Sequence, residues 1–134
     1  MGTPLPDYGL VGRWLGGMPR GRFRHPRITA TPAVRGEQAI GWAAHYATGI
    51  AFAAVFMAML GAAVISRPTI LPALIFGVAT VAAPFFLMQP GMGAGIAARN
   101  APRPATARLQ SLVTHAIFGI GLFAAARLLN IGGA

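Results

Sequence analysis

Two histidines are the side chains of this sequence best suited to chemistry, because each lies within a long apolar segment. His45 and His115 both stand six residues beyond the start of their segment. An imidazole can exchange a proton near neutral pH or ligate a metal, and an ionisable group inside hydrocarbon is by default a functional hypothesis. Small residues also lie four positions before and four positions after each histidine.

Three interpretations of these histidines are open. Small neighbours clear a helix face, as a haem or chlorin ligated by His45 and His115 would require. The same small residues let membrane helices pack closely with no cofactor between them, and glycine, alanine and serine are common throughout this sequence. We therefore favour histidines that pack or form hydrogen bonds, over a proton or substrate pathway and over a haem, pigment or metal site. The sequence accordingly predicts no cofactor and no metal.

The candidate site that these residues define is a polar pocket near one membrane boundary. If the apolar segments are helices, the two histidines lie at matching depths of about 9 Å, at a rise of about 1.5 Å per residue. Side chains that can form hydrogen bonds lie close to them in sequence or at similar depth. The predicted pocket comprises His45, His115, Gln89, Thr48 and Thr114.

A run rich in proline and glycine ends the second apolar segment at a similar depth. Pro84 lies deep in that segment, where its missing N–H should bend a helix. The break that follows comprises Pro90, Gly91, Gly93 and Gly95. Interrupted helices line cavities in transporters, but we favour a close-packing or helix-ending role because such patterns are common in membrane helices.

Acidic residues are too few for most hydrolytic mechanisms. Asp7 and Glu37 are the only two, and the sequence has no cysteine. No Ser-His-acid constellation, Walker motif or zinc-binding spacing is present. Asp7 is placed to cap a helix, and Glu37 is expected to form an interfacial ion pair with Arg99 or Arg108. The sequence therefore predicts a non-enzymatic protein.

Transmembrane helices are the elements that must position these residues. Hydrophobic residues make up 55% of the 134-residue chain and charged residues 10%, against about 25% charged residues in soluble domains. Three segments reach the length of about 20 apolar residues that a bilayer crossing requires. They are residues 39–65, 70–88 and 109–129. The predicted fold is an all-α transmembrane bundle of three spans, within a membrane domain of residues 39–134.

Residues 1–38 form a basic segment ahead of the first span. They lack the apolar core of a signal peptide. Residues 8–16 place four apolar side chains near one face, which predicts a short helix at the membrane surface. We expect the whole segment to be cytoplasmic or interfacial.

The arginines determine the expected orientation. The net charge is +9, and only Arg67 and Arg127 lie on the side opposite the other arginines. Positively charged flanks stay in the cytoplasm, so we expect a multi-pass protein with a cytoplasmic N-terminus and a periplasmic C-terminus. The lack of lysine and the abundance of alanine, glycine and proline are typical of a bacterial protein of the inner membrane.

Anionic lipid headgroups are the expected partners of these arginines. No recognition module for nucleic acid accompanies the charge, so the sequence predicts no nucleic-acid partner. The arginines expected to contact headgroups are Arg20, Arg22, Arg24, Arg27, Arg99, Arg103 and Arg108.

Several longer strings resemble a known family. They are DYGLVGRWLG (Asp7–Gly16), RGE (Arg35–Glu37), GWAAHY (Gly41–Tyr46), MQPGMGAG (Met88–Gly95) and SLVTH (Ser111–His115). Together they resemble the bacterial membrane family called domain of unknown function 2938, over nearly the whole chain. The resemblance implies an integral inner-membrane protein and no assigned activity. In relatives a further apolar helix is expected ahead of the first of these strings, whereas only residues 1–6 precede Asp7 here. With that helix the bundle would have four spans.

Three alternative functions follow from these observations. The first is a non-enzymatic helical bundle, either a homo-oligomer or an accessory subunit of a larger membrane complex. The second is a proton or small-molecule pathway with a cytoplasm-facing polar pocket, and a haem- or pigment-binding module is a third alternative. The small size and the many small residues favour the first.

Overall fold

The computed structural model describes residues 7–132, except the side chains of residues 64–65 and 131–132. Helix makes up 78% of the structure, and the described part contains no strand. Three helices are long and apolar enough to cross a membrane, namely Glu37–Ala63, Ile70–Met92 and Pro104–Asn130. The predicted all-α fold with three candidate spans is therefore confirmed.

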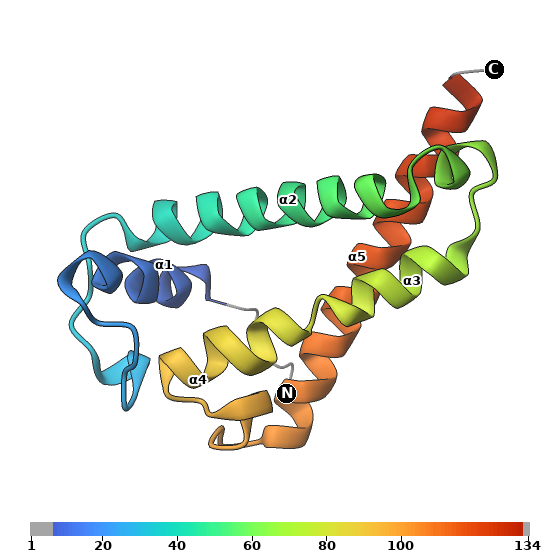
Figure 1. The fold of residues 1–134 in the computed structure, drawn as a ribbon. Coiled ribbons are helices and arrows are strands. Elements are labelled where there is room, and N and C mark those ends of the chain that lie inside the picture. The colour runs from blue at the N-terminus through green and yellow to red at the C-terminus, as the bar shows by residue number, and fades with distance from the viewer. Residues whose placement is uncertain (1–6, 133–134) are drawn as a thin grey trace.

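Five α-helices and four shorter turns follow one another along the described chain (Figure 1). The helices are α1 (Tyr8–Gly17), α2 (Glu37–Ser66), α3 (Ile70–Ala79), α4 (Gln89–Met92) and α5 (Pro104–Gly132). The turns are the 3₁₀ turns η1 (Met18–Arg20), η2 (Ile28–Ala30) and η4 (Ile96–Ala98), and the π-helical turn η3 (Pro84–Met88).

Helix α1 lies against the first turns of α2 (Figure 1). Asp7 begins α1, because its carboxylate accepts a hydrogen bond of 2.9 Å from the Gly9 amide. Gly12 and Gly41 lie where the helices cross. A Cβ atom on Gly12 would overlap the Glu37 carbonyl, and one on Gly41 would overlap the Tyr8 carbonyl. Glycine at both positions therefore permits this approach.

Helices α3 and α5 cross in the same manner. A Cβ atom on Gly77 of α3 would lie 2.6 Å from the Gly119 Cα atom. A Cβ atom on Gly119 of α5 would lie 2.6 Å from the Ala73 carbonyl oxygen. Ala73, only 1% exposed, fills the centre of this contact. Small residues on both helices thus bring the two backbones together within the apolar part of the chain.

The second span is interrupted at Thr80. Val81 N–H bonds to the Val78 carbonyl instead of continuing the α-helical ladder to Gly77. Pro84 has no N–H to donate to the Thr80 carbonyl, which accepts from Ala83 instead. The chain resumes as the π turn η3 and then as α4, where Pro90 occupies the first turn and Gly93 ends the helix in a left-handed conformation (φ 92°).

Helix α2 makes few contacts with the other two spans. Phe56, 2% exposed, packs on Phe76 of α3 at a ring separation of 5.1 Å, and Phe52 approaches Phe118 of α5 at 6.4 Å. The remainder of α2 diverges from α3 and α4 (Figure 1). Only 6% of the most apolar stretch of its span is buried by the rest of the chain, against 22% for the corresponding stretch of the second span.

We expect Gly119→Ala to destabilise the protein by about 1–3 kcal/mol, because the added methyl group overlaps the α3 backbone. Gly121→Ala is the matched control on the same helix, since nothing lies within 4 Å of its Cβ position. Alanine at that site should be neutral or slightly stabilising. Unfolding in detergent, followed by circular dichroism, measures both, and equal loss in the two variants would contradict the glycine contact.

Candidate functional site at the arginine-rich end

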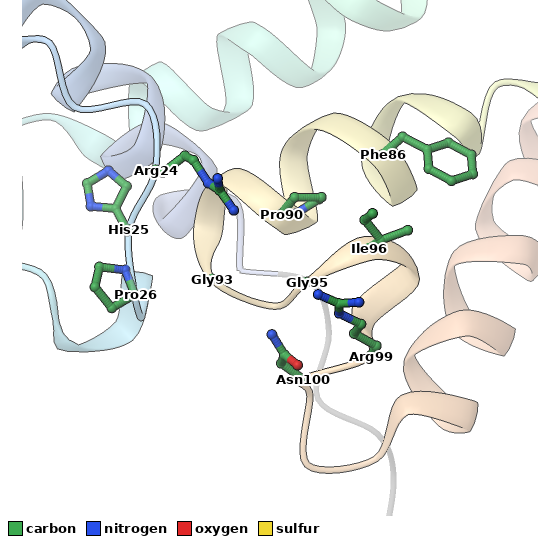
Figure 2. A pocket seen from close by; sticks show the side chains of 10 residues that line it. All are labelled: Arg24, His25, Pro26, Phe86, Pro90, Gly93, Gly95, Ile96, Arg99 and Asn100. Atoms are coloured by element: carbon green, nitrogen blue, oxygen red, sulfur yellow. The ribbon is translucent and has the colours of Figure 1, made fainter.

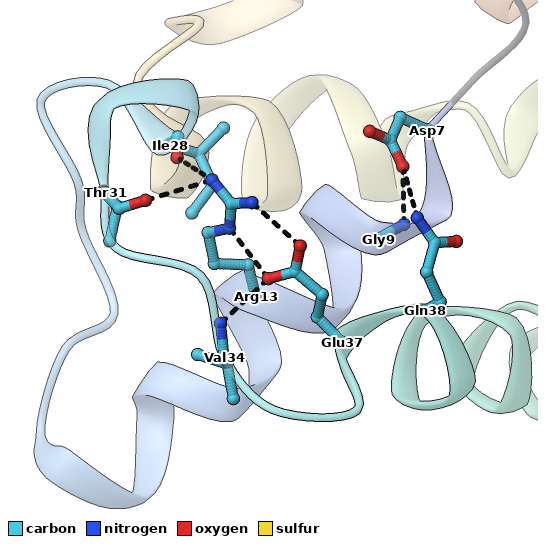
Figure 3. A network of polar contacts seen from close by, with 8 residues as sticks. All are labelled: Asp7, Gly9, Arg13, Ile28, Thr31, Val34, Glu37 and Gln38. Carbon is cyan, nitrogen blue, oxygen red and sulfur yellow. Dashed lines mark hydrogen bonds and ion pairs between the residues drawn. The ribbon is translucent and has the colours of Figure 1, made fainter.

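An ion pair between Arg13 and Glu37 joins α1 to the start of α2 (Figure 3). Arg13 Nε donates to Glu37 Oε2 at 2.9 Å, and its Nη2 donates to Oε1 at 2.8 Å. Arg13 Nη1 also donates to the carbonyls of Thr31 (3.0 Å) and Ile28 (3.3 Å). The Val34 amide donates to Glu37 Oε2 at 2.9 Å. The two side chains of this ion pair thus hold the stretch from Ile28 to Val34 against α1 and α2.

The expected partner of Glu37 was wrong. The sequence suggested Arg99 or Arg108, but the structure pairs Glu37 with Arg13. Arg13 was expected only to lie in a cytoplasmic or interfacial segment, because no local pattern indicates a pair separated by 24 residues. The hydrogen bond to Glu37 raises the pKa of Arg13 above its usual value.

Trp14 and two glycines hold α4 against the N-terminal segment. Trp14, 6% exposed, donates from Nε1 to the Phe23 carbonyl at 2.8 Å. A Cβ atom on Gly91 would lie 2.7 Å from Trp14 Nε1, and one on Gly93 would lie 2.7 Å from the His25 carbonyl oxygen. The His25 amide donates to the Gly91 carbonyl at 2.8 Å. These glycines therefore provide close packing as well as ending the helix.

His25 is a buried histidine that the sequence did not single out. Thr31 Oγ1 donates to the Arg27 carbonyl at 3.1 Å and lies 3.2 Å from His25 Nδ1. Because the hydroxyl has one proton, it accepts from Nδ1–H. His25 is 7% exposed and its Nε2 atom is buried without a hydrogen-bond partner. It lies in a basic, proline-broken loop with no periodicity, so no sequence signal indicated burial.

His115 has the same arrangement inside the α3–α5 pair. Thr80 Oγ1 donates to the Gly77 carbonyl at 2.6 Å and lies 2.7 Å from His115 Nδ1. The hydroxyl therefore accepts from Nδ1–H of His115. It also satisfies a carbonyl that the helix interruption would leave unpaired.

The five residues of the predicted polar pocket fall into different surroundings. His45 is exposed on α2 beside the rings of Tyr8 (4.4 Å) and Tyr46 (5.5 Å). Thr48 is also exposed on α2, whereas Thr114 donates to the Gln110 carbonyl within α5.

Gln89, at the start of α4, contacts α5. Its Nε2 donates to Ser111 Oγ at 3.5 Å, and its Oε1 is buried without a partner. No hydrogen bond or ring contact recorded within residues 7–132 joins His45 to His115. Within the same range no three His, Asp or Glu side chains are grouped to hold a metal ion. One pocket formed by all five residues stays a prediction.

A cleft of about 540 Å³ opens beside the helix break (Figure 2). Its walls come from the loop before η2, from η3 and from the turns on either side of η4. The lining residues are Arg24, His25, Pro26, Phe86, Pro90, Gly93, Gly95, Ile96, Arg99 and Asn100. Two of the seven arginines expected to contact headgroups line this cleft.

The other five of these arginines lie around the same end of the molecule. All are exposed, namely Arg20, Arg22, Arg27, Arg103 and Arg108. Arg108 also donates from Nε to the Ala97 carbonyl at 2.7 Å. This end therefore combines the break in the second span with most of the positive charge.

Three apolar helices of spanning length and an arginine-rich end are features of a multi-pass membrane protein. The chain matches the family described as "Protein of unknown function (DUF2938)" over residues 1–129, and it belongs to that family. The resemblance noted from the sequence is thereby confirmed. No curated protein and no solved structure matches the chain.

We expect Glu37→Gln to loosen the contact between α1 and the η2 segment. The amide keeps the size of the side chain, but it removes the negative charge opposite Arg13 and one of the two acceptor atoms. Amide hydrogen exchange of residues 28–37 should become faster, while that of α5 stays unchanged. Arg35→Gln is the control, because Arg35 is exposed and two residues away. Unchanged exchange in Glu37→Gln would show that the ion pair does not order the segment.

Thr80→Val should cost about 1–3 kcal/mol of stability, because it removes the buried hydroxyl that bridges the Gly77 carbonyl and His115 Nδ1. Thr114→Val provides the comparison, since that exposed hydroxyl bonds only within its own helix. Its cost should stay below about 1 kcal/mol. Unfolding in detergent ranks the two variants, and a Thr80→Val protein as stable as Thr114→Val would refute the bridging role.

Proposed function

We propose that this chain is a non-catalytic component of a helical assembly in the bacterial inner membrane, acting without a cofactor. The observation that supports the proposal is the state of α2. Its candidate span, Glu37–Ala63, is 27 residues long, and only 6% of the most apolar stretch of this span is buried by the rest of the chain. Helices of a small bundle normally pack on one another, so α2 has a surface available for a further helix.

The face of α2 that would receive this helix is lined by alanine. It comprises Ala43, Ala47, Ala51, Ala54 and Ala58, and all five are exposed. At about 100° per residue they fall within an arc of about 80°, and Phe52 and Phe56 point about 140° and about 180° away from its centre. Small residues let two helices approach closely, whereas contact with lipid does not require them.

A second copy of the chain is the partner that this face fits best. Two identical α2 helices in one membrane run parallel, because both chains share one topology. A twofold axis would then place the same alanines of the two copies opposite one another. The assembly is therefore a homo-oligomer in its simplest form, to which other membrane subunits could be added.

The orientation belongs to the same proposal. The arginine-rich end, with α1, the cleft and the start of α5, faces the cytoplasm, and Arg67 and Arg127 lie toward the periplasm. The aromatic residues Trp42 and Tyr46, 44% and 63% exposed at the start of α2, support this placement because such residues favour the membrane interface.

Cysteine cross-linking tests the alanine face, and the sequence has no native cysteine to interfere. In native membranes, oxidised Ala51→Cys or Ala58→Cys protein should form a covalent dimer, because the Cα atoms of two facing copies come within about 7 Å. Leu60→Cys, at nearly the same depth as Ala58, points away and should stay monomeric. Dimers that form equally at all three positions, or at none, would contradict packing through the alanine face.

A further inference from the structure

We propose that the cleft between residues 24–26 and residues 93–100 binds the phosphodiester headgroup of one anionic phospholipid. This site is independent of the alanine face, which lies along α2. The ligand class follows from three features of the lining, namely its charge, its apolar end and its position relative to the second span.

Charge is the first feature. Arg24 and Arg99 both line the cleft, and Asn100 adds an amide that can donate or accept (Figure 2). The chain has only two carboxylate side chains, and both are engaged elsewhere: Glu37 binds Arg13, and Asp7 caps α1. No carboxylate within residues 7–132 therefore neutralises the two guanidinium groups. A phosphodiester supplies the missing charge and suits the donor geometry of arginine.

The apolar end of the cleft is the second feature. Phe86 and Ile96 lie together at the side of the cleft nearest the π turn, while Arg24 lies toward the opposite side (Figure 2). Phe86 is 64% exposed and Ile96 is 48% exposed. Such side chains beside a pair of guanidinium groups match a ligand that has an anionic headgroup and acyl chains. An inorganic anion would leave Phe86 and Ile96 without contacts.

Position along the membrane normal is the third feature. The second candidate span ends at Met92, so Arg99 and Asn100 lie just beyond the apolar layer. Phe86 lies six residues before that end, about 9 Å deeper at a rise of about 1.5 Å per residue. Charged and apolar lining residues therefore occupy the levels of a lipid headgroup and of the first part of its acyl chains.

The walls of the cleft are held in place by hydrogen bonds. The His25 amide bonds to the Gly91 carbonyl at 2.8 Å, and Arg108 Nε bonds to the Ala97 carbonyl at 2.7 Å. Ala97 and Ala98 adopt positive φ angles of 51° and 57°, which are unfavourable for residues with a side chain. A pre-shaped cleft of about 540 Å³ is in the range of about 300–1,000 Å³ that holds drug-sized ligands, so it has room for a headgroup larger than phosphate.

Native mass spectrometry of the full chain in detergent tests the proposal. Phosphatidylglycerol should bind at one molecule per chain and be retained in preference to zwitterionic phosphatidylcholine. Arg24→Gln/Arg99→Gln should lower the affinity for phosphatidylglycerol about 10- to 30-fold, because each arginine near an anionic lipid contributes a factor of about three to five. The circular dichroism spectrum should be unchanged, since neither arginine has a recorded partner within the described residues.

Arg20→Gln/Arg103→Gln is the matched control, because it removes the same charge from the same end outside the cleft. It should change the affinity by less than about threefold. Equal losses in both double variants would overturn the proposal in favour of unspecific attraction, as would equal binding of the two lipids by the unmodified protein. The anionic ligand could also be a soluble phosphate ester, and competition with glycerol phosphate tests this. Displacement of phosphatidylglycerol by glycerol phosphate at equal concentration would show a site for a soluble anion and overturn the proposal.

Discussion

Close approach of helix backbones at paired glycines is the constraint on which the rest of this structure depends. Gly12 meets α2 beside Gly41, and Gly77 meets Gly119 across the α3–α5 pair. In hydrocarbon, apolar side chains gain little by leaving lipid for one another, so association depends on packing and on hydrogen bonds. Each pair accordingly has a polar bridge close to its crossing. Arg13 and Glu37 join α1 to α2, and Thr80 joins His115 to α3.

The two helix pairs meet where Phe56 and Phe52 of α2 pack on α3 and α5. At the arginine-rich end the N-terminal segment contacts α4, where Trp14 lies against Gly91 and the His25 amide bonds to the Gly91 carbonyl. This contact depends on the end of α4 at Gly93. A helix that continued past Gly93 would have no free carbonyl at Gly91 and no room for the loop before η2. The turn at Gly93 thus shapes the cleft, while α2 keeps most of its surface outside the bundle.

The sequence predicted those parts of the fold that depend on local composition. The three spans and the helix that Asp7 caps follow from runs of apolar residues and from one capping side chain. Contacts between distant segments could not be predicted in this way. Residues 1–38 were expected only to be cytoplasmic or interfacial, although Arg13 within them binds Glu37 and His25 is buried. The partner of Arg13 depends on the crossing of α1 with α2, and the burial of His25 depends on a loop that packs against α4, and no short sequence pattern encodes either contact.

The account places the cleft and the Arg13–Glu37 ion pair toward one membrane face, with the second span crossing to the other. Single cysteines at Thr69 and Ala105, both exposed, test this most directly when labelled with a membrane-impermeant maleimide. In intact cells whose outer membrane is permeable to the reagent, Thr69→Cys should react, and Ala105→Cys should react only after the inner membrane is opened. Reaction of Ala105→Cys in intact cells, or of both positions together, would contradict the proposed topology.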